Sequence, residues 1–335
     1  MYKQKNILTD SFGRKHNYLR ISLTEKCNLR CTYCMPEDGV LLTPREQLMT
    51  TDEVFEIASL FVKHGVNKIR LTGGEPLVRK DFSTILAKLS SLNAELSMTT
   101  NAILADRYID DFKKCGLNKL NVSLDSLSPE KFKFITRRDH LNKTYENILL
   151  LINEGFDVKI NVVLMKGVND DEIVDFINLT GTLPTCIRFI EFMPFDGNKW
   201  NKSKLVSEEF ILQKAFSSFK KENILKLDDE ANFTSRNYQI KGFKGSFGII
   251  SSVTNPFCNG CNRIRLTANG KLKNCLFSNL ETDLLTPLRD HQPVEGLIAG
   301  KIFGKKKVRA GMNTFEKLNN PKLHSNNRSM ITIGG

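Results

Sequence analysis

The sequence of 335 residues lacks any long apolar run. Residues 1–17 are polar and include Lys3, Lys5, Arg14 and Lys15, so this part of the chain has no signal-peptide pattern. Nothing further along approaches the roughly 20 apolar residues of a membrane span. We therefore expect a cytoplasmic protein with no membrane partner. A chain of this length can form one large domain, or one domain with a smaller appendage.

Large aromatic residues with a polar edge are also scarce, because the chain has one Trp and six Tyr. The 22 Phe occur mainly in apolar patterns, which argues against the aromatic-rich basic surface of a nucleic-acid-binding protein. Acidic residues number 37 against 49 Lys and Arg, and the net charge of +12 allows a nucleic acid, an acidic surface or a polyanionic small molecule as partner. The basic stretch from Lys305 to Arg309 is expected to be solvated and not to bind nucleic acid.

Cysteine makes up only 8 of the 335 residues, yet Cys27, Cys31 and Cys34 lie within eight positions. In a cytosolic protein such a group favours metal ligation over disulfides. Three thiolates leave one coordination position open, which is typical of an iron–sulfur cluster with one free iron. Zinc and three unrelated free thiols are the alternatives. Cys115 and Cys186 stand outside any motif and are expected to be buried packing residues.

A second cysteine triplet lies near the end of the chain. Its members are Cys258, Cys261 and Cys275. No fourth ligand is close in sequence, and a zinc site completed by the distant His291 or His324 is the alternative to a second cluster. Arg263 and Arg265 share one face of an expected extended segment between these cysteines, and two guanidinium groups in that position suit phosphates.

Strand-like and helix-like segments alternate along the first 192 residues. The expected strands are residues 20–24, 68–72, 94–99, 119–124, 158–164 and 186–192. The expected helices start with a capping box at residues 50–53 and reach 65, then cover 81–92, 104–115, 145–154 and 170–179. This alternation predicts a parallel sheet, either an incomplete (β/α) barrel or an open doubly wound sheet. After residue 192 the alternation stops, and a smaller region with a helix over 207–221 begins.

Polar residues on the strands distinguish between these two sheet architectures, the incomplete barrel and the open doubly wound sheet. Parallel strands are usually apolar on both faces, but here three strands carry polar residues on one face. These residues are Lys68, Arg70 and Thr72, then Asn121, Ser123 and Asp125, then Lys159 and Asn161. A curved sheet that encloses a polar, anionic ligand explains this pattern. A Gly-Gly turn over residues 72–76 follows the second strand and permits close approach of the backbone to a ligand.

The cysteine triplet at 27–34, the turn at 72–76 and the second triplet together resemble the radical S-adenosylmethionine (SAM) superfamily, and within it the MoaA family of GTP 3′,8-cyclases. Further matching segments are residues 121–125, 159–163, 188–193, 257–266 and the terminal Gly334-Gly335. The resemblance implies an α/β fold, an incomplete (β/α)6 radical SAM barrel with a smaller C-terminal extension carrying a second iron–sulfur cluster. Residues 1–200 would form the partial barrel with an N-terminal arm, and 201–335 the extension with the auxiliary cluster and GTP-binding residues.

The resemblance also implies the site residues. Two [4Fe–4S] clusters would be held by Cys27, Cys31 and Cys34 and by Cys258, Cys261 and Cys275. SAM contacts would come from Tyr33, Gly74, Ser123 and Met193. GTP contacts would come from Arg20, Arg70, Thr99, Lys159, Arg263, Ile264 and Arg265, with Lys68 and Arg188 adding positive charge. Residues 329–333 are expected to dock as a short extended segment that places Gly334 and Gly335 in the cavity for a catalytic role.

The implied activity is conversion of GTP to (8S)-3′,8-cyclo-7,8-dihydroguanosine 5′-triphosphate, with SAM cleaved to 5′-deoxyadenosine and methionine. This is an early step of molybdopterin biosynthesis. The implied partners are a low-potential electron donor and the cyclic pyranopterin monophosphate synthase that receives the product, and the resemblance permits a homodimer. A peptide-modifying radical SAM maturase with an auxiliary cluster is the alternative enzyme, and a basic nucleic-acid-binding protein with two structural metal sites is the alternative without catalysis.

Overall fold

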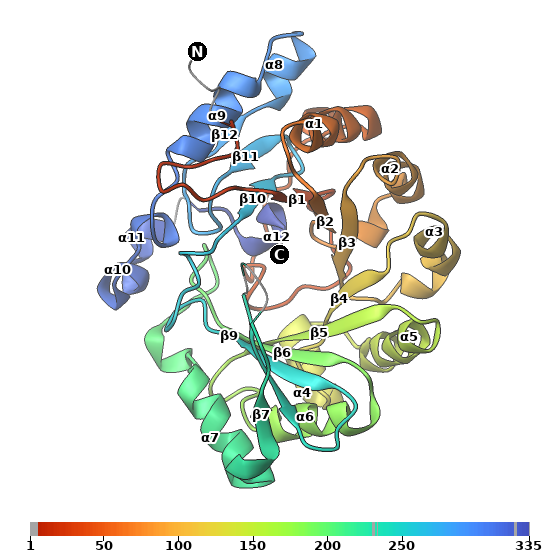
Figure 1. The fold of residues 1–335 in the computed structure, drawn as a ribbon, viewed down its shortest axis with the longest axis vertical. Helices are drawn as coiled ribbons and strands as arrows, with labels where there is room; N and C mark the ends of the chain where they lie inside the picture. The colour runs from red at the N-terminus through yellow and green to blue at the C-terminus, as the bar shows by residue number, and fades with distance from the viewer. Residues whose placement is uncertain (1–5, 230–231, 233, 325–326, 335) are drawn as a thin grey trace.

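The computed structural model describes residues 6–229, 232, 234–324 and 327–334. Within these residues one sheet has the strand order β12-β11-β10-β1-β2-β3-β4-β5-β6-β9-β8-β7. Its central strands are β1 Tyr18–Ser22, β2 Lys68–Thr72, β3 Glu95–Thr100, β4 Lys119–Ser123, β5 Asp157–Leu164 and β6 Cys186–Glu191. These six strands are parallel and adjacent in chain order. Figure 1 shows the sheet curved into an open ring, which confirms the incomplete (β/α)6 barrel.

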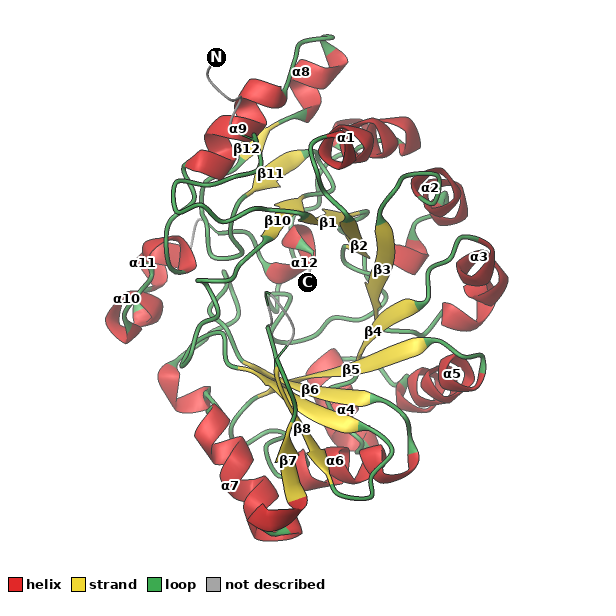
Figure 2. Cartoon of the chain, in the orientation of Figure 1, coloured by secondary structure: helices red, strands yellow, loops and turns green. Residues whose placement is uncertain are grey.

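Helices cover the outside of this ring (Figure 2). Those that connect the barrel strands are α1 Thr51–Lys63, α2 Phe82–Leu89, α3 Ile109–Lys114, α4 Pro129–Thr136, α5 Leu141–Asn153 and α6 Ile173–Thr182. α1 begins with the expected capping box, in which Thr50 and Glu53 exchange hydrogen bonds. On β2 the side chains of Ile69 and Leu71 are fully buried in the apolar core. The alternate residues of the strand therefore remain for the inside of the ring.

The C-terminal region extends the barrel sheet at both of its edges. β9 (Ser246–Ile250) pairs in parallel with β6, and β10 (Arg263–Leu266) pairs in parallel with β1. The remaining strands are β7 Ile224–Lys226, β8 Arg236–Ile240, β11 Lys271–Lys273 and β12 Thr282–Asp283. The remaining helices are α7 Glu208–Phe219, α8 Leu285–Arg289, α9 Glu295–Phe303, α10 Phe315–Asn319, α11 Pro321–His324 and α12 Met330–Ile333. The two cysteine-bearing parts of the chain thus share one sheet.

The expected element boundaries need small corrections. The first strand ends at Ser22 and not at Thr24, because the Thr24 carbonyl already accepts a hydrogen bond from Gly74 N in the loop after β2 (2.7 Å). The helix α4 was not expected. Cys115 and Cys186 are half-buried and not fully buried. In the part of the chain that the structure describes, no helix has both the length and the apolar character needed to cross a membrane.

Candidate functional site

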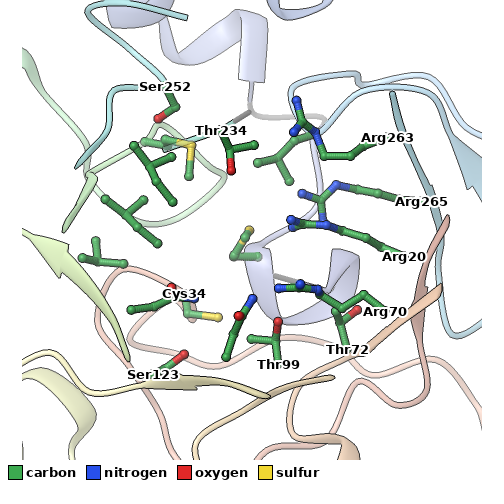
Figure 3. Close-up of a pocket in the computed structure, with 18 of the residues that line it drawn as sticks. Arg20, Cys34, Arg70, Thr72, Thr99, Ser123, Thr234, Ser252, Arg263 and Arg265 are labelled. Atoms are coloured by element: carbon green, nitrogen blue, oxygen red, sulfur yellow. The ribbon is translucent and has the colours of Figure 1, made fainter. Parts of the chain in front are cut away.

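A cavity of about 300 Å³ lies inside the curve of the sheet. All six cysteines of the two triplets line it. The other expected site residues that line it are Arg20, Tyr33, Arg70, Gly74, Thr99, Ser123, Met193, Arg263 and Arg265. In Figure 3, the four arginines project into the cavity from one side, opposite Cys34 and Ser123. The fold therefore brings two cysteine triplets that are more than 200 residues apart into one site.

The first cysteine loop is fastened to the Gly-Gly turn by backbone hydrogen bonds. Gly74 N donates to Thr24 O, and Glu75 N donates to Lys26 O (2.8 Å). Burial raises the pKa of the Cys27 thiol to about 12, with the Glu75 charge adding to the effect, and burial also raises the pKa of Cys31. Three thiolates are unfavourable in such a place unless a cation compensates them.

The donor set fits an iron–sulfur cluster, whose irons supply this compensation. Burial raises the pKa of Cys34 as well. The protein groups around the three thiols therefore do not favour their thiolate forms. Among the described residues, no three His, Cys, Asp or Glu side chains are grouped as ligands of a single metal ion. A cluster does not require such convergence, because each thiolate binds a different iron.

We expect Gly74→Ala to disrupt the first cysteine loop. A Cβ at this position would lie 2.2 Å from the Lys26 carbonyl oxygen, which is backbone and cannot swing aside. The expected cost is about 1–3 kcal/mol of stability, together with a loss of iron from the first site. Thermal unfolding and iron content after anaerobic reconstitution measure both effects.

Gly296→Ala is the matched control for this change. A Cβ at Gly296 meets nothing within 4 Å, and Gly296 lies inside α9, where Ala is favoured over Gly by about 0.5–1 kcal/mol. A Gly74→Ala protein with full iron and unchanged unfolding would contradict the assignment of Gly74 to the support of the loop.

A buried tyrosine–aspartate pair stands beside the first triplet. The Tyr33 hydroxyl donates to Asp125 Oδ2 (2.7 Å), and Val163 N donates to Asp125 Oδ1 (2.8 Å). Burial raises the pKa of Asp125 to about 6, although these hydrogen bonds oppose the shift. The strand pattern in the sequence predicts Asp125 on the inner face of the sheet. It does not predict the pairing with Tyr33, because that pairing is a contact between residues 92 positions apart.

The cationic side of the cavity is built by three adjacent strands. In the sheet register Arg20 on β1 lies between Arg70 on β2 and Arg265 on β10. Burial lowers the pKa of Arg70 to about 10 and lowers that of Arg265 further, with neighbouring cations adding to both shifts. Burial would raise the pKa of Tyr18, but the charges of Arg20 and Arg70 lower it to about 8. The local potential is therefore strongly positive.

Among the described residues, no ion pair with Asp or Glu is formed by Arg20, Arg70, Arg263 or Arg265, although Arg263 lies beside the Cys261 thiol. Three of their nitrogens, Arg20 Nε, Arg70 Nε and Arg263 Nη2, are buried and find no hydrogen-bond acceptor within the part of the chain that the structure describes. Unpaired buried cations are costly, so the arrangement favours an anionic ligand that supplies the missing acceptors.

Three expected GTP contacts or cationic neighbours lie outside this cavity. Ile264 is fully buried in the apolar core, because strand alternation turns it away from Arg263 and Arg265, and only its backbone remains for a ligand. Lys159 lines a second cavity of about 480 Å³, which shares Arg188 with the first. Lys68 forms an ion pair with Glu95 (2.8 Å).

The expectation of a solvated stretch from Lys305 to Arg309 is wrong for its two ends. Lys305 and Arg309 are 4% and 6% exposed, whereas Lys306 and Lys307 are exposed. Arg309 lines the cavity and donates to Val253 O (2.6 Å). The sequence pattern missed these two residues because a run of basic residues does not reveal which side chains face inward. His291, a suggested zinc ligand, is exposed and the side chain of His324 lies outside the described part.

The end of the chain enters the barrel. Residues 330–333 form a helical turn, α12, and not the expected extended segment. The prediction that this segment docks against the rest of the protein is confirmed, because Ile331 and Ile333 are buried. The carbonyl oxygen of Gly334 accepts a hydrogen bond from Arg265 Nη1. A Cβ on Gly334 would lie 2.4 Å from Thr72 Oγ1. Figure 1 shows α12 inside the ring. Gly335 lies outside the described residues.

Comparison with known proteins identifies the protein class to which the chain belongs. A family profile described as the radical SAM superfamily matches residues 21–180, and one described as Molybdenum Cofactor Synthesis C matches residues 185–310. Streptococcus suis SuiB bound to S-adenosylmethionine has the same fold, with a TM-score of 0.58, 15% identity, and coverage of 84% of this chain and 67% of that chain. The chain is a radical SAM protein, a class whose members use SAM and a [4Fe–4S] cluster.

The relatives narrow the class. A GTP 3′,8-cyclase, mitochondrial, from Arabidopsis thaliana is 48% identical over 98% of this chain and 84% of its own length. A GTP 3′,8-cyclase from Clostridium botulinum is 41% identical over 89% of this chain and 93% of its own length. Molybdenum cofactor biosynthesis protein 1 of Mus musculus is 48% identical, but the chain spans about half of it (51%). The chain belongs to the GTP 3′,8-cyclase family of molybdenum cofactor biosynthesis.

Proposed function

We propose that this protein converts GTP to (8S)-3′,8-cyclo-7,8-dihydroguanosine 5′-triphosphate while SAM is cleaved to 5′-deoxyadenosine and methionine. One observation carries the proposal: two cysteine triplets and a row of arginines that, in the described part of the chain, form no ion pair with Asp or Glu line the same cavity. A radical enzyme that acts on an anionic nucleotide needs its radical source and its anion-binding groups in one space from which water is excluded. Family membership supports the assignment of GTP as that nucleotide.

At the first site, Cys27, Cys31 and Cys34 would bind the cluster that holds SAM. Around it, SAM contacts would come from Tyr33, Gly74, Ser123 and Met193. When bound, this cluster and SAM supply a 5′-deoxyadenosyl radical that removes the ribose 3′-hydrogen of GTP. The contribution of the chain is positioning: Gly74 leaves room for the Lys26 carbonyl of the first cysteine loop, and Asp125 accepts a hydrogen bond from the Tyr33 hydroxyl.

At the second site, Cys258, Cys261 and Cys275 would bind an auxiliary [4Fe–4S] cluster with an open iron for the guanine base. The triphosphate, with about four negative charges, would be neutralised by the arginine row, and charge-assisted hydrogen bonds of roughly 1.5–3 kcal/mol each would hold it. Arg188 and Lys159 extend this positive surface into the second cavity. Thr99 and the Ile264 backbone would complete the contacts.

We also propose the remaining assignments. The partial barrel would occupy residues 1–200 and the auxiliary-cluster extension residues 201–335. A low-potential donor would supply two electrons per turnover, one for the cleavage of SAM and one, with a proton, for the reduction of the cyclised nucleotide radical. The product would pass to a cyclic pyranopterin monophosphate synthase. A cytoplasmic location and a homodimer stay predictions.

Anaerobic reconstitution with GTP, SAM and a low-potential reductant tests the function. We expect a nucleotide product isomeric with GTP by mass, together with one 5′-deoxyadenosine per product. Omission of SAM or of the reductant should remove both signals. Steady SAM cleavage without any nucleotide product would overturn the proposal and favour the peptide-modifying alternative.

Arg263→Ala and Arg265→Ala should each weaken GTP binding by about 1–3 kcal/mol and leave SAM binding unchanged, because each loses a charged hydrogen-bond donor to phosphate. Anaerobic titration with each ligand measures the difference. Lys307→Ala is the control, since its side chain is exposed outside the cavity. Equal GTP affinity in the two arginine variants and the wild type would assign both residues a structural role only.

A further inference from the structure

A buried hydrogen-bonded chain leads from the N-terminal arm to the second cysteine triplet. Asp10 and His16, which are 4% and 0% exposed, are joined by His16 Nε2 and Asp10 Oδ2 (3.0 Å). His16 Nδ1 lies 3.4 Å from Lys305 Nζ, and Lys305 Nζ lies 3.4 Å from Cys261 Sγ. Arg14 closes the arm onto the same region, because it bonds to Asp10 Oδ2 and to Cys258 O.

The geometry fixes the roles of the donors and acceptors. The three neighbours of Lys305 Nζ are a sulfur atom, an imidazole nitrogen and the carbonyl oxygen of Arg263 (2.8 Å), all of which can accept a hydrogen bond. An ammonium group has three donors and no acceptor, so it matches this environment fully. The neutral tautomer of His16 follows: Nε2 donates to Asp10, and Nδ1 accepts from Lys305.

The charge of Lys305 has no carboxylate partner among the described residues. Its ammonium group is buried, and the nearest group that can carry negative charge is the Cys261 thiolate. The surrounding charges that face this point are those of Arg14, Arg263 and Asp10, and the carboxylate of Asp10 is already shared by Arg14 and His16. A buried cation in this position is compensated only when the thiolate site carries net negative charge.

We propose that Lys305 is a positioning residue for the auxiliary cluster: the Asp10–His16 pair holds its ammonium group against Cys261, where it raises the reduction potential of the cluster. This inference rests on the proposed function, because it requires a cluster at the second triplet. Hydrogen bonds to ligand sulfur and nearby positive charge both stabilise the form with one more electron. Cys258 and Cys275 receive no comparable side-chain donor among the described hydrogen bonds.

The test isolates the auxiliary cluster in full-length protein in which Cys27, Cys31 and Cys34 are replaced by Ala. Iron content and an EPR-monitored redox titration with dithionite are compared for this protein and for the same protein with Lys305→Met, Lys305→Arg or Lys306→Met. Lys305→Met should make reduction at least tenfold less favourable, a shift of about 59 mV to lower potential for a one-electron couple. Lys306→Met, at an exposed neighbour, should leave the potential unchanged.

The outcomes are distinguishable. If the triple-Ala protein holds no iron, the auxiliary cluster of the proposed function fails, and this inference fails with it. If the cluster assembles and Lys305→Met leaves its potential unchanged, only the inference is overturned. If Lys305→Met cannot assemble the cluster, Lys305→Arg decides: retained iron and potential support the charge role, whereas loss of iron in both variants shows that the lysine acts through packing and overturns it.

Discussion

Replacement of Cys27, Cys31 or Cys34 by Ala should abolish the reductive cleavage of SAM. Each cysteine supplies one of only three thiolates at the first site, and a cluster that lacks a ligand has no path for the electron to the sulfonium. We expect 5′-deoxyadenosine to fall below detection in an anaerobic assay with an excess of reductant.

Replacement of Cys258, Cys261 or Cys275 should give a different result. SAM cleavage should continue at a reduced, uncoupled rate, while cyclisation of GTP is lost. Iron should fall from about eight to about four atoms per chain in either set of variants, as two four-iron clusters require. Cys115→Ala, which stands outside both triplets and is half-buried, should retain the iron and both activities.

Two results would contradict this division of labour. Stoichiometric zinc at either triplet would exclude a cluster there. A Cys258→Ala protein that forms the cyclised nucleotide at the wild-type rate would show that the second triplet is not the substrate site. Because iron content and product are measured on the same sample, a variant that merely misfolds is recognised by the loss of iron from both sites.

Much of the barrel was predictable because its signals are local. The polar residues at 68, 70 and 72 alternate with Ile69 and Leu71, and the structure places the two apolar residues in the core and Arg70 and Thr72 at the cavity. The cysteine triplets are local as well, since their spacing is read within a few residues. The start of α1 is local too, because the capping box formed by Thr50 and Glu53 lies within four residues of sequence.

The remaining features depend on contacts between distant parts of the chain. Nothing near Arg263 in sequence indicates that β10 pairs with β1, about 245 residues earlier, by the register that joins Tyr18 to Arg263. The burial of Lys305 follows from contacts with His16 and Cys261, so composition alone suggested an exposed lysine. Lys159 lies on a strand whose inner face the sequence predicts. It stands near the start of β5, however, and there it lines the second cavity and not the first.

The C-terminal glycines are expected to be essential for cyclisation although they lie at the end of the chain. Deletion of Gly334 and Gly335, or Gly334→Ala alone, should reduce product formation by about 10²-fold or more, because a displacement of about 1 Å in an active site has that effect. The Ala side chain would collide with Thr72 Oγ1, and Gly334 has φ +85°, a conformation that Ala adopts only with strain. Deletion also removes the acceptor of Arg265 Nη1.

The measurement compares cyclised product with 5′-deoxyadenosine in each variant. Both clusters and SAM cleavage should persist, since the atoms nearest to a Cβ on Gly334 belong to Ser22 and Thr72 and its carbonyl oxygen accepts from Arg265, none of which is a cysteine of either triplet. The buried Ile331 and Ile333 keep α12 docked, so the fold should survive, and Gly296→Ala is again the control. A truncated protein that forms the cyclic product at the wild-type rate would make the tail a passive terminus. Selective loss of cyclisation instead means that Arg265 presents its guanidinium to the nucleotide only while the Gly334 carbonyl holds it in place.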